Sequence, residues 1–169
     1  GKSLYAKINP IAEKQGVITM VGFNRRYYSN FNQGLEIIKR HGSLLGVLVE
    51  GHERLAQIRA MDFHPEHVLS SWLYANSTHT IDLLRFFGGE IQETQSVARG
   101  YQEKGGDQFS ATIRFESGAI GTYVAHWLSP GGWRVVLYGE EVTVEFKPLE
   151  QGVWIDSGYE SHLISNTEE

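Results

Sequence analysis

The sequence predicts an α+β fold, in which helices pack on one face of an open, largely antiparallel or mixed β-sheet. Helical periodicity fills the first half of the chain, up to Gly89. The remainder contains runs of β-branched and aromatic residues separated by turn residues, such as Ser117-Gly118 and Gly139-Glu140. Turns of this kind favour antiparallel hairpins. Helices followed by a run of strands are typical of α+β domains.

Two elements are expected before residue 24. Residues 2–15 carry apolar residues at helical spacing, which predicts a helix, although Pro10 lacks the N–H that a helix interior uses. Residues 17–23 are an almost continuous apolar run, typical of a strand that is buried on both faces.

A second helix and a strand follow. Residues 31–41 predict a helix that ends at Gly42, because basic residues fill its last turn. Residues 44–50 predict a strand. Residues 51–70 are polar, contain three histidines and predict an irregular connection.

Residues 76–87 predict the best-defined helix of the chain. Three residues could cap its N-terminus with a side-chain oxygen, namely Asn76, Ser77 and Thr78. An apolar stripe for core packing is formed by Ile81, Leu84 and Phe87. Gly88-Gly89 ends the helix. His79 therefore lies near a helix N-terminus, a position that favours anions and carbonyl oxygens.

The second half predicts only strands. They are expected at residues 91–101, 109–115, 120–127, 133–138 and 141–146. One face of this sheet would present Thr112, Arg114 or their neighbours away from the helices. Residues 161–169 show no stop signal and no closing element, so we expect the chain to end before the domain is complete.

The segment Asn76–Gly89 resembles the His-x-Ile-Asp-Leu-Leu-Arg element of the Gfo/Idh/MocA family of NAD(P)-dependent oxidoreductases. Residues 17–27 resemble the family's strand that ends in an Asn-x-Arg-Tyr/Phe pattern. Residues 115–121 resemble a hairpin of its substrate domain, and residues 138–146 also fit in order and spacing. The resemblance covers about residues 2–153.

The resemblance implies a domain like the C-terminal domain of glyceraldehyde-3-phosphate dehydrogenase. The family's Gly-x-Gly-x-x-Gly turn and its Glu-Lys-Pro element with the catalytic lysine are missing here, and both are expected upstream of Gly1. Residues 1–23 would then be the end of a Rossmann domain, and residues 24–169 a substrate-binding and oligomerisation domain. NAD or NADP would bind the full-length protein, with no cofactor and no turnover expected for this chain alone.

By the same resemblance, His79 would be the catalytic residue that faces a hydroxyl of a sugar, cyclitol or similar polyol. Asn24, Arg26 and Asn76 would bind the substrate, and Asp82 could orient His79. Simpler roles stay open: a backbone-bonded histidine, an arginine in a salt bridge, a capping asparagine and a structural aspartate. Strand alternation would point Arg25 to the opposite face from Arg26.

Other readings of the sequence remain. Relatives of the inositol-dehydrogenase type carry an Asp four residues before the histidine, where this chain has Ala75. The alternative is thus a non-catalytic ligand-binding or assembly domain.

A third hypothesis is a metal-dependent hydrolase. Its metal ligands would be the loop residues Asp62, His64 and His67, with His52 and Glu53 as additional ligands. We favour a solvated loop and assign no metal ligand. His126, Trp127 and Trp133 could line a pocket, although core or interface roles are favoured.

Composition limits the partners. The chain has 169 residues, a net charge of −5, 15 basic and 20 acidic residues, and no cysteine. The charge argues against nucleic acid and anionic membranes as partners. The sequence contains no apolar run long enough for a transmembrane helix. We expect a cytoplasmic homo-oligomer that associates through the open face of the sheet.

Overall fold

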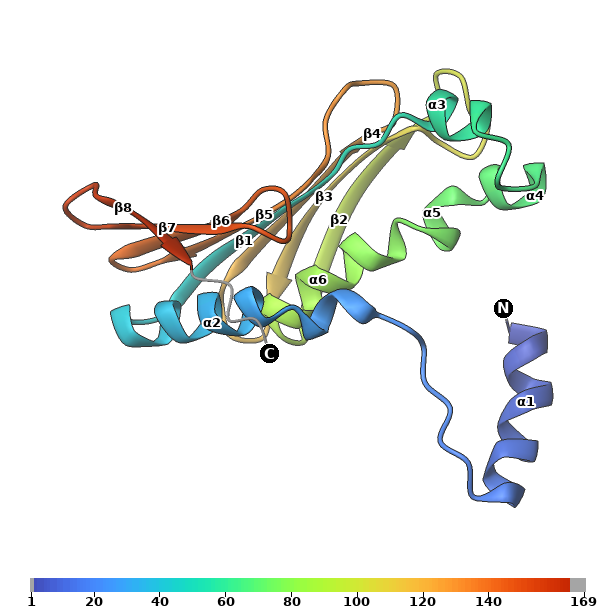
Figure 1. Cartoon of the computed structure of the whole chain (residues 1–169), viewed down its shortest axis with the longest axis horizontal. Coiled ribbons are helices and arrows are strands. Elements are labelled where there is room, and N and C mark those ends of the chain that lie inside the picture. The colour runs from blue at the N-terminus through green and yellow to red at the C-terminus, as the bar shows by residue number, and fades with distance from the viewer. Residues whose placement is uncertain (1, 165–169) are drawn as a thin grey trace.

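The computed structural model describes residues 2–164 and is built around one eight-stranded sheet (Figure 1). Its spatial order is β2-β3-β4-β1-β5-β6-β7-β8. The strands are β1 Leu44–Gly51, β2 Ile91–Arg99, β3 Gln108–Phe115, β4 Ile120–His126, β5 Trp133–Gly139, β6 Val142–Phe146, β7 Gly152–Asp156 and β8 Ser161–Ile164. Strands β1 and β4 pair in parallel, and the other neighbours pair antiparallel. The predicted α+β fold with a mixed open sheet is confirmed.

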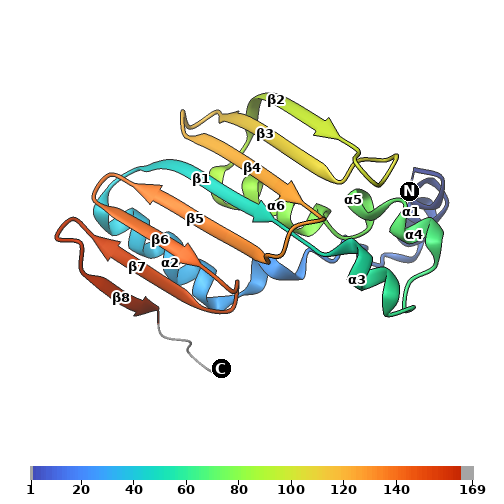
Figure 2. The ribbon, with the colours of Figure 1, turned by 90° about the horizontal axis from the view of Figure 1, so that it is seen from above.

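Two helices, α2 and α6, cover one side of the sheet (Figure 1). The helical elements are α1 Lys2–Gln15, η1 Asn24–Tyr27, α2 Ser29–His41, α3 Leu55–Ala60, α4 Glu66–Leu69, α5 Trp72–Ala75 and α6 Thr78–Gly88, where η1 is a 3-10 turn. Helices α2 and α6 run beneath the sheet, and the opposite face carries no helix (Figures 1 and 2). None of the described helices is long and apolar enough to cross a membrane.

The core lies between these two helices and the sheet. Val47 and Val49 of β1 are fully buried, as strand alternation requires for the helix-facing side. Phe31 of α2 packs on Phe146 of β6 with ring centroids 4.8 Å apart. Helix α2 can approach because its position 34 is glycine: a Cβ there would lie 2.5 Å from the Phe146 ring. Burying one such side chain contributes roughly 1.5–3 kcal/mol.

The predicted strand at residues 17–23 is wrong. This segment is extended but unpaired, and Ile18 and Met20 are 93% and 72% exposed. A strand needs neighbours for its backbone hydrogen bonds, and no strand among residues 2–164 lies beside it. Figure 1 shows α1 standing apart from the sheet at the end of this segment. The assignment of residues 1–23 to a nucleotide-binding domain stays a prediction.

Three further expectations are corrected. The connection at residues 51–70 is not irregular, because it contains α3 and α4. Strands β7 and β8 were not expected, and β8 occupies Ser161–Ile164, where we expected no closing element; residues 165–169 lie outside the described part. Helix α6 begins without a side-chain cap, because α5 leads into it through a continuous series of turns.

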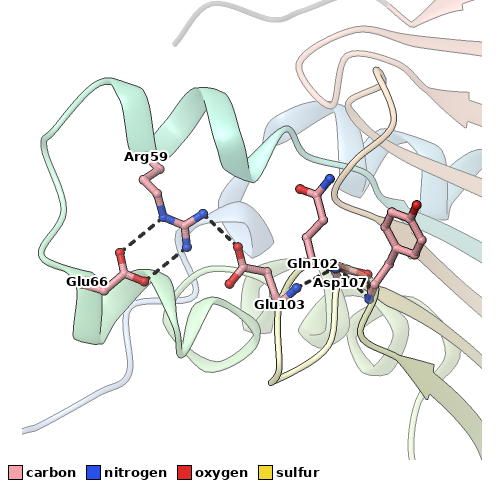
Figure 3. A network of polar contacts seen from close by, with 6 residues as sticks. Arg59, Glu66, Gln102, Glu103 and Asp107 are labelled. Carbon is pink, nitrogen blue, oxygen red and sulfur yellow. Dashed lines mark hydrogen bonds and ion pairs between the residues drawn. The ribbon is translucent and has the colours of Figure 1, made fainter.

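A polar network fastens α3 and α4 to the loop between β2 and β3 (Figure 3). Arg59 donates to Glu66 of α4 at 3.2 and 3.3 Å, and to Glu103 of the loop at 2.8 Å. The carboxylate of Asp107 is fully buried and accepts the backbone N–H groups of the three loop residues Tyr101, Gln102 and Glu103 at 2.6–3.0 Å. One loop thus receives its shape from one buried carboxylate.

Candidate functional site

The first turn of α6 holds His79 in a mostly aromatic surrounding. Its ring lies edge-on to Phe23, with centroids 6.0 Å apart, and 6.4 Å from the ring of Trp133. Its Nδ1 atom is buried and has no hydrogen-bond partner among the described residues. Buried polar atoms in folded proteins nearly always have a partner. Among the described residues Gln33 Nε2, Ser77 Oγ and Trp127 Nε1 are unpaired in the same way. Of these four side chains only the imidazole can both accept and donate a proton in acid–base chemistry, which makes His79 the candidate for contact with a ligand hydroxyl or carbonyl.

Asn76 lies beside His79 but does not cap the helix. Its side-chain amide donates to both carboxylate oxygens of Glu53, at 2.9 and 3.1 Å. Its backbone carbonyl accepts the N–H of His79 at 3.0 Å. The capping role is therefore wrong, and the predicted role in substrate binding stays a prediction.

Glu53 is the residue that sequence reasoning placed wrongly. We considered it only as an additional ligand of a loop metal, but its carboxylate is the meeting point of three N–H donors at the site. Burial raises the pKa of Glu53, and the hydrogen bonds from Trp72, Trp133 and Asn76 partly offset that rise. The signal in the sequence was its place just beyond a buried central strand, where ligands gather in open sheets of α/β proteins.

Gly51 explains how the end of β1 reaches α6. A Cβ at this position would lie 2.6 Å from the hydroxyl of Tyr123 and 3.0 Å from Oγ1 of Thr80. Because residue 51 is glycine, the end of β1 can pack closely against Tyr123 and Thr80. Glu53 then lies beside the start of α6.

Arg26 and Asp82 form a two-pronged ion pair. Nε and Nη2 of Arg26 each donate to one oxygen of Asp82, both at 2.6 Å. The hydrogen bonds to Asp82 raise the pKa of Arg26 further. Asp82 thus holds η1 against α6, and no hydrogen bond joins it to His79 in the described part of the chain. The substrate role of Arg26 stays a prediction.

Arg25 packs over two aromatic rings beside the site. Residues 24–27 form a 3-10 turn, so alternation does not apply. The guanidinium of Arg25 lies over the rings of Tyr28 and Trp133, at 5.2 and 5.5 Å from their centroids, and is 3.6 Å from Glu150. Asn24 is exposed at the start of the turn, and its predicted substrate contact is likewise untested.

The loop residues of the metal reading do not come together. Within residues 2–164, the group whose ligand atoms converge is Asp156, Glu160 and His162 on the β7–β8 hairpin, not Asp62, His64 and His67. His64 instead packs edge-on against Trp72 at 5.4 Å. Trp127 is a core residue with 2% exposure, as favoured, whereas Trp133 borders His79.

Comparison with known proteins gives the class. The sequence profile of the GFO/IDH/MocA C-terminal domain matches residues 47–145, which is more than half of the chain. No curated protein sequence matches this chain. The chain therefore belongs to the GFO/IDH/MocA family and carries its C-terminal domain, as the sequence motifs indicated.

Solved structures share the fold at low identity. A levoglucosan dehydrogenase in complex with NADH and L-sorbose is 18% identical, with a TM-score of 0.73 over 89% of this chain and 47% of its own. UDP-N-acetylglucosamine 3-dehydrogenase GnnA from Acidithiobacillus ferrooxidans is 11% identical, with a TM-score of 0.74 over 97% and 52%. An NAD-binding oxidoreductase from Klebsiella pneumoniae is 17% identical, with a TM-score of 0.70 over 97% and 50%. This chain spans about half the length of these proteins.

Proposed function

We propose that this chain is the substrate-binding part of an NAD(P)-dependent dehydrogenase that oxidises or forms a CH–OH group of a sugar, cyclitol or similar polyol. The observation that carries the proposal is the unpaired, buried Nδ1 of His79 at the start of α6. Family membership and the names of the sugar dehydrogenases with this fold support the same class.

His79 suits proton handling at a substrate hydroxyl. An imidazole changes charge near neutral pH and can accept or donate a proton at either nitrogen. The aromatic rings of Phe23 and Trp133 beside it offer apolar surfaces of the kind that sugar rings pack on. Asn24, Arg26 and Asn76 are the proposed substrate-binding residues around it.

This chain would contact the substrate and the reacting end of a dinucleotide, and not the phosphates. The sequence has no Gly-x-Gly-x-x-Gly turn for the phosphates, whereas the unpaired nitrogen of His79 fits a small hydroxylated group. When bound, NAD or NADP would supply the hydride chemistry. The chain's own residues would orient the substrate, and His79 would move its hydroxyl proton. The phosphate-binding turn would lie upstream of Gly1 in a longer cytoplasmic protein.

Ala75 favours a second candidate, a binding or assembly domain without catalysis. Its methyl group stands where the resemblance led us to expect an acid, so no carboxylate is present four residues before His79. Such a domain would bind a polyol but show no substrate-dependent reduction of NAD(P).

We also propose that the open sheet face packs against a second copy. Ile120, Tyr138 and Leu163 project from the side without helices and are 47%, 42% and 82% exposed. Apolar side chains gathered on one face favour association. Light scattering should give a dimer or larger assembly, and Tyr138→Glu should shift it toward the monomer. A monomeric wild-type protein would contradict this arrangement.

Calorimetry tests the proposed function on two proteins: this chain, and a version extended upstream through a nucleotide-binding domain. We expect NAD(H) or NADP(H) to bind only the longer one, which should then reduce its cofactor with members of a sugar and polyol panel. Binding by neither protein would defeat the redox assignment. Cofactor binding without any turnover would favour the domain without catalysis.

A further inference from the structure

Glu53 lies two residues beyond the end of β1 and joins it to helix α5 and strand β5. Its carboxylate accepts Nε1–H of Trp72 at 2.7 Å, Nδ2–H of Asn76 at 2.9 and 3.1 Å, and Nε1–H of Trp133 at 3.2 Å. These donors come from the start of α5, the residue after α5 and the start of β5. One carboxylate therefore sets the positions of an amide and two indoles.

The donors around Glu53 are neutral. No ion pair to Glu53 exists within residues 2–164, so its protein partners there are the N–H dipoles of two indoles and one amide. Withdrawing a carboxylate from water without a cationic partner costs free energy, and burial accordingly raises its pKa. Groups held in this unfavourable state concentrate at functional sites, which distinguishes Glu53 from an ordinary surface glutamate.

Two of the three residues that donate to Glu53 also lie next to His79. The indole of Trp133 lies 6.4 Å from the imidazole, and the backbone carbonyl of Asn76 accepts the N–H of His79 at 3.0 Å. The same indole also lies under the guanidinium of Arg25, 5.5 Å away. The position of Trp133 thus determines the space available beside His79.

Other ionisable groups surround this network. They are His52 next to Glu53 in the chain, His64 at Trp72, His79 and Arg25 at Trp133, and Tyr123 on β4. Burial raises the pKa of the Tyr123 phenol, and the charge of Glu53 adds to that rise. Glu53 is therefore close enough for its charge to be felt at the buried hydroxyl beneath α6.

We propose that Glu53 is the positioning residue of the His79 site, whose ionised carboxylate fixes Trp133 and Asn76 beside His79 and so shapes the surface against which a substrate must pack. The proposal rests on the proposed function for its catalytic consequence. The hydrogen-bond network itself can be tested on this chain without any substrate.

The first test follows the four indole N–H signals of this chain by NMR as the pH changes. The Trp72 and Trp133 signals should shift together, with one midpoint above 4.5, the ordinary pKa of a glutamate. The shared transition should vanish in Glu53→Gln and persist in Glu116→Gln, which alters an exposed glutamate. Indoles that do not titrate, or that titrate equally in Glu53→Gln, would overturn the proposal. If that variant does not fold, the wild-type titration decides.

The second test uses the longer protein that reduces NAD(P). Misplaced groups beside a reacting centre cost rate, so Glu53→Gln should lower kcat/KM by roughly 10- to 100-fold, with unchanged cofactor affinity. Glu53→Asp, which keeps the carboxylate, should restore part of the rate. If the wild-type protein turns over substrate and Glu53→Gln does so equally well, the positioning role alone is wrong. If the wild-type protein shows no turnover, the proposed function is wrong, and the positioning role is wrong with it.

Discussion

Arg26 and Asp82 are 56 residues apart in sequence and meet in a two-pronged ion pair with both N···O distances at 2.6 Å. Asp82 is 10% exposed at its side chain and Arg26 is 36% exposed. The pair is the main polar link between the turn η1 and helix α6. It therefore holds the segment that carries Arg25 and Phe23 against the helix that carries His79.

Asp82→Asn should destabilise the fold by about 1–2 kcal/mol, because it removes a charge-assisted hydrogen bond and leaves a partly buried guanidinium without its counter-charge. Chemical denaturation measures this. The matched control is Arg85→Gln on the same helix, which breaks the exposed pair with Glu90 beyond the end of the helix and should cost no more than about 0.5 kcal/mol. Equal effects of the two variants would show that the Arg26 link is not structural.

Asp107→Asn should destabilise the protein by about 1–3 kcal/mol, since an amide NH₂ would then face backbone N–H donors. Burial raises the pKa of Asp107, but the backbone N–H groups outweigh burial and hold it below its ordinary value of 3.8. A lowered folded-state pKa contributes stability that is complete well above 3.8 and is lost as the pH falls through the folded-state pKa. The difference between wild type and Asp107→Asn should therefore shrink in acid.

Denaturant titrations at neutral and acidic pH measure that difference. Asp62→Asn is the control, because Asp62 is exposed and its positive φ of 55° suits asparagine. A pH-independent difference for Asp107→Asn would contradict the role of its charge.

Arg59→Gln should loosen α3, α4 and the β2–β3 loop without unfolding the sheet. The arginine donates to Glu66 and Glu103 on opposite sides (Figure 3), and losing two partly exposed pairs should lower the local opening free energy by roughly 1 kcal/mol. Hydrogen exchange should become faster at residues 55–69 and 100–107 and stay unchanged in β1. Arg54→Gln, at an exposed arginine just before α3, should leave the exchange as in wild type. Uniform acceleration over the sheet would contradict a local role.

The sequence predicted the sheet and its covering helices because burial follows periodicity. The alternation in β3 and β4 indicates which face each residue turns to the core. On α6, Leu84 and Phe87 of the predicted stripe are buried, whereas Ile81 is 38% exposed and Leu83 takes its place in the core. Residues 17–23 have the same apolar character and form no strand, because a strand also needs a neighbour, which composition does not reveal.

The candidate site was predictable only where a motif marked it. His79 stood out by its place at the start of a helix. Glu53 did not, because its significance comes from Trp72, Asn76 and Trp133, up to 80 residues away in sequence. Strand alternation was the wrong basis for placing Arg25, because residues 24–27 form a 3-10 turn, which hydrophobic periodicity does not encode.

The most direct test of the central claim is the steady-state kinetics of the longer, cofactor-binding protein with His79 replaced by Gln. If His79 moves the substrate's hydroxyl proton, His79→Gln should lower kcat/KM by about 10²- to 10⁴-fold, while the affinity for NAD(P)H and the sheet fold stay as in wild type. His67→Gln, at an exposed histidine of α4, should change little. A His79→Gln protein with kcat/KM equal to the wild-type value would contradict the assignment of this site.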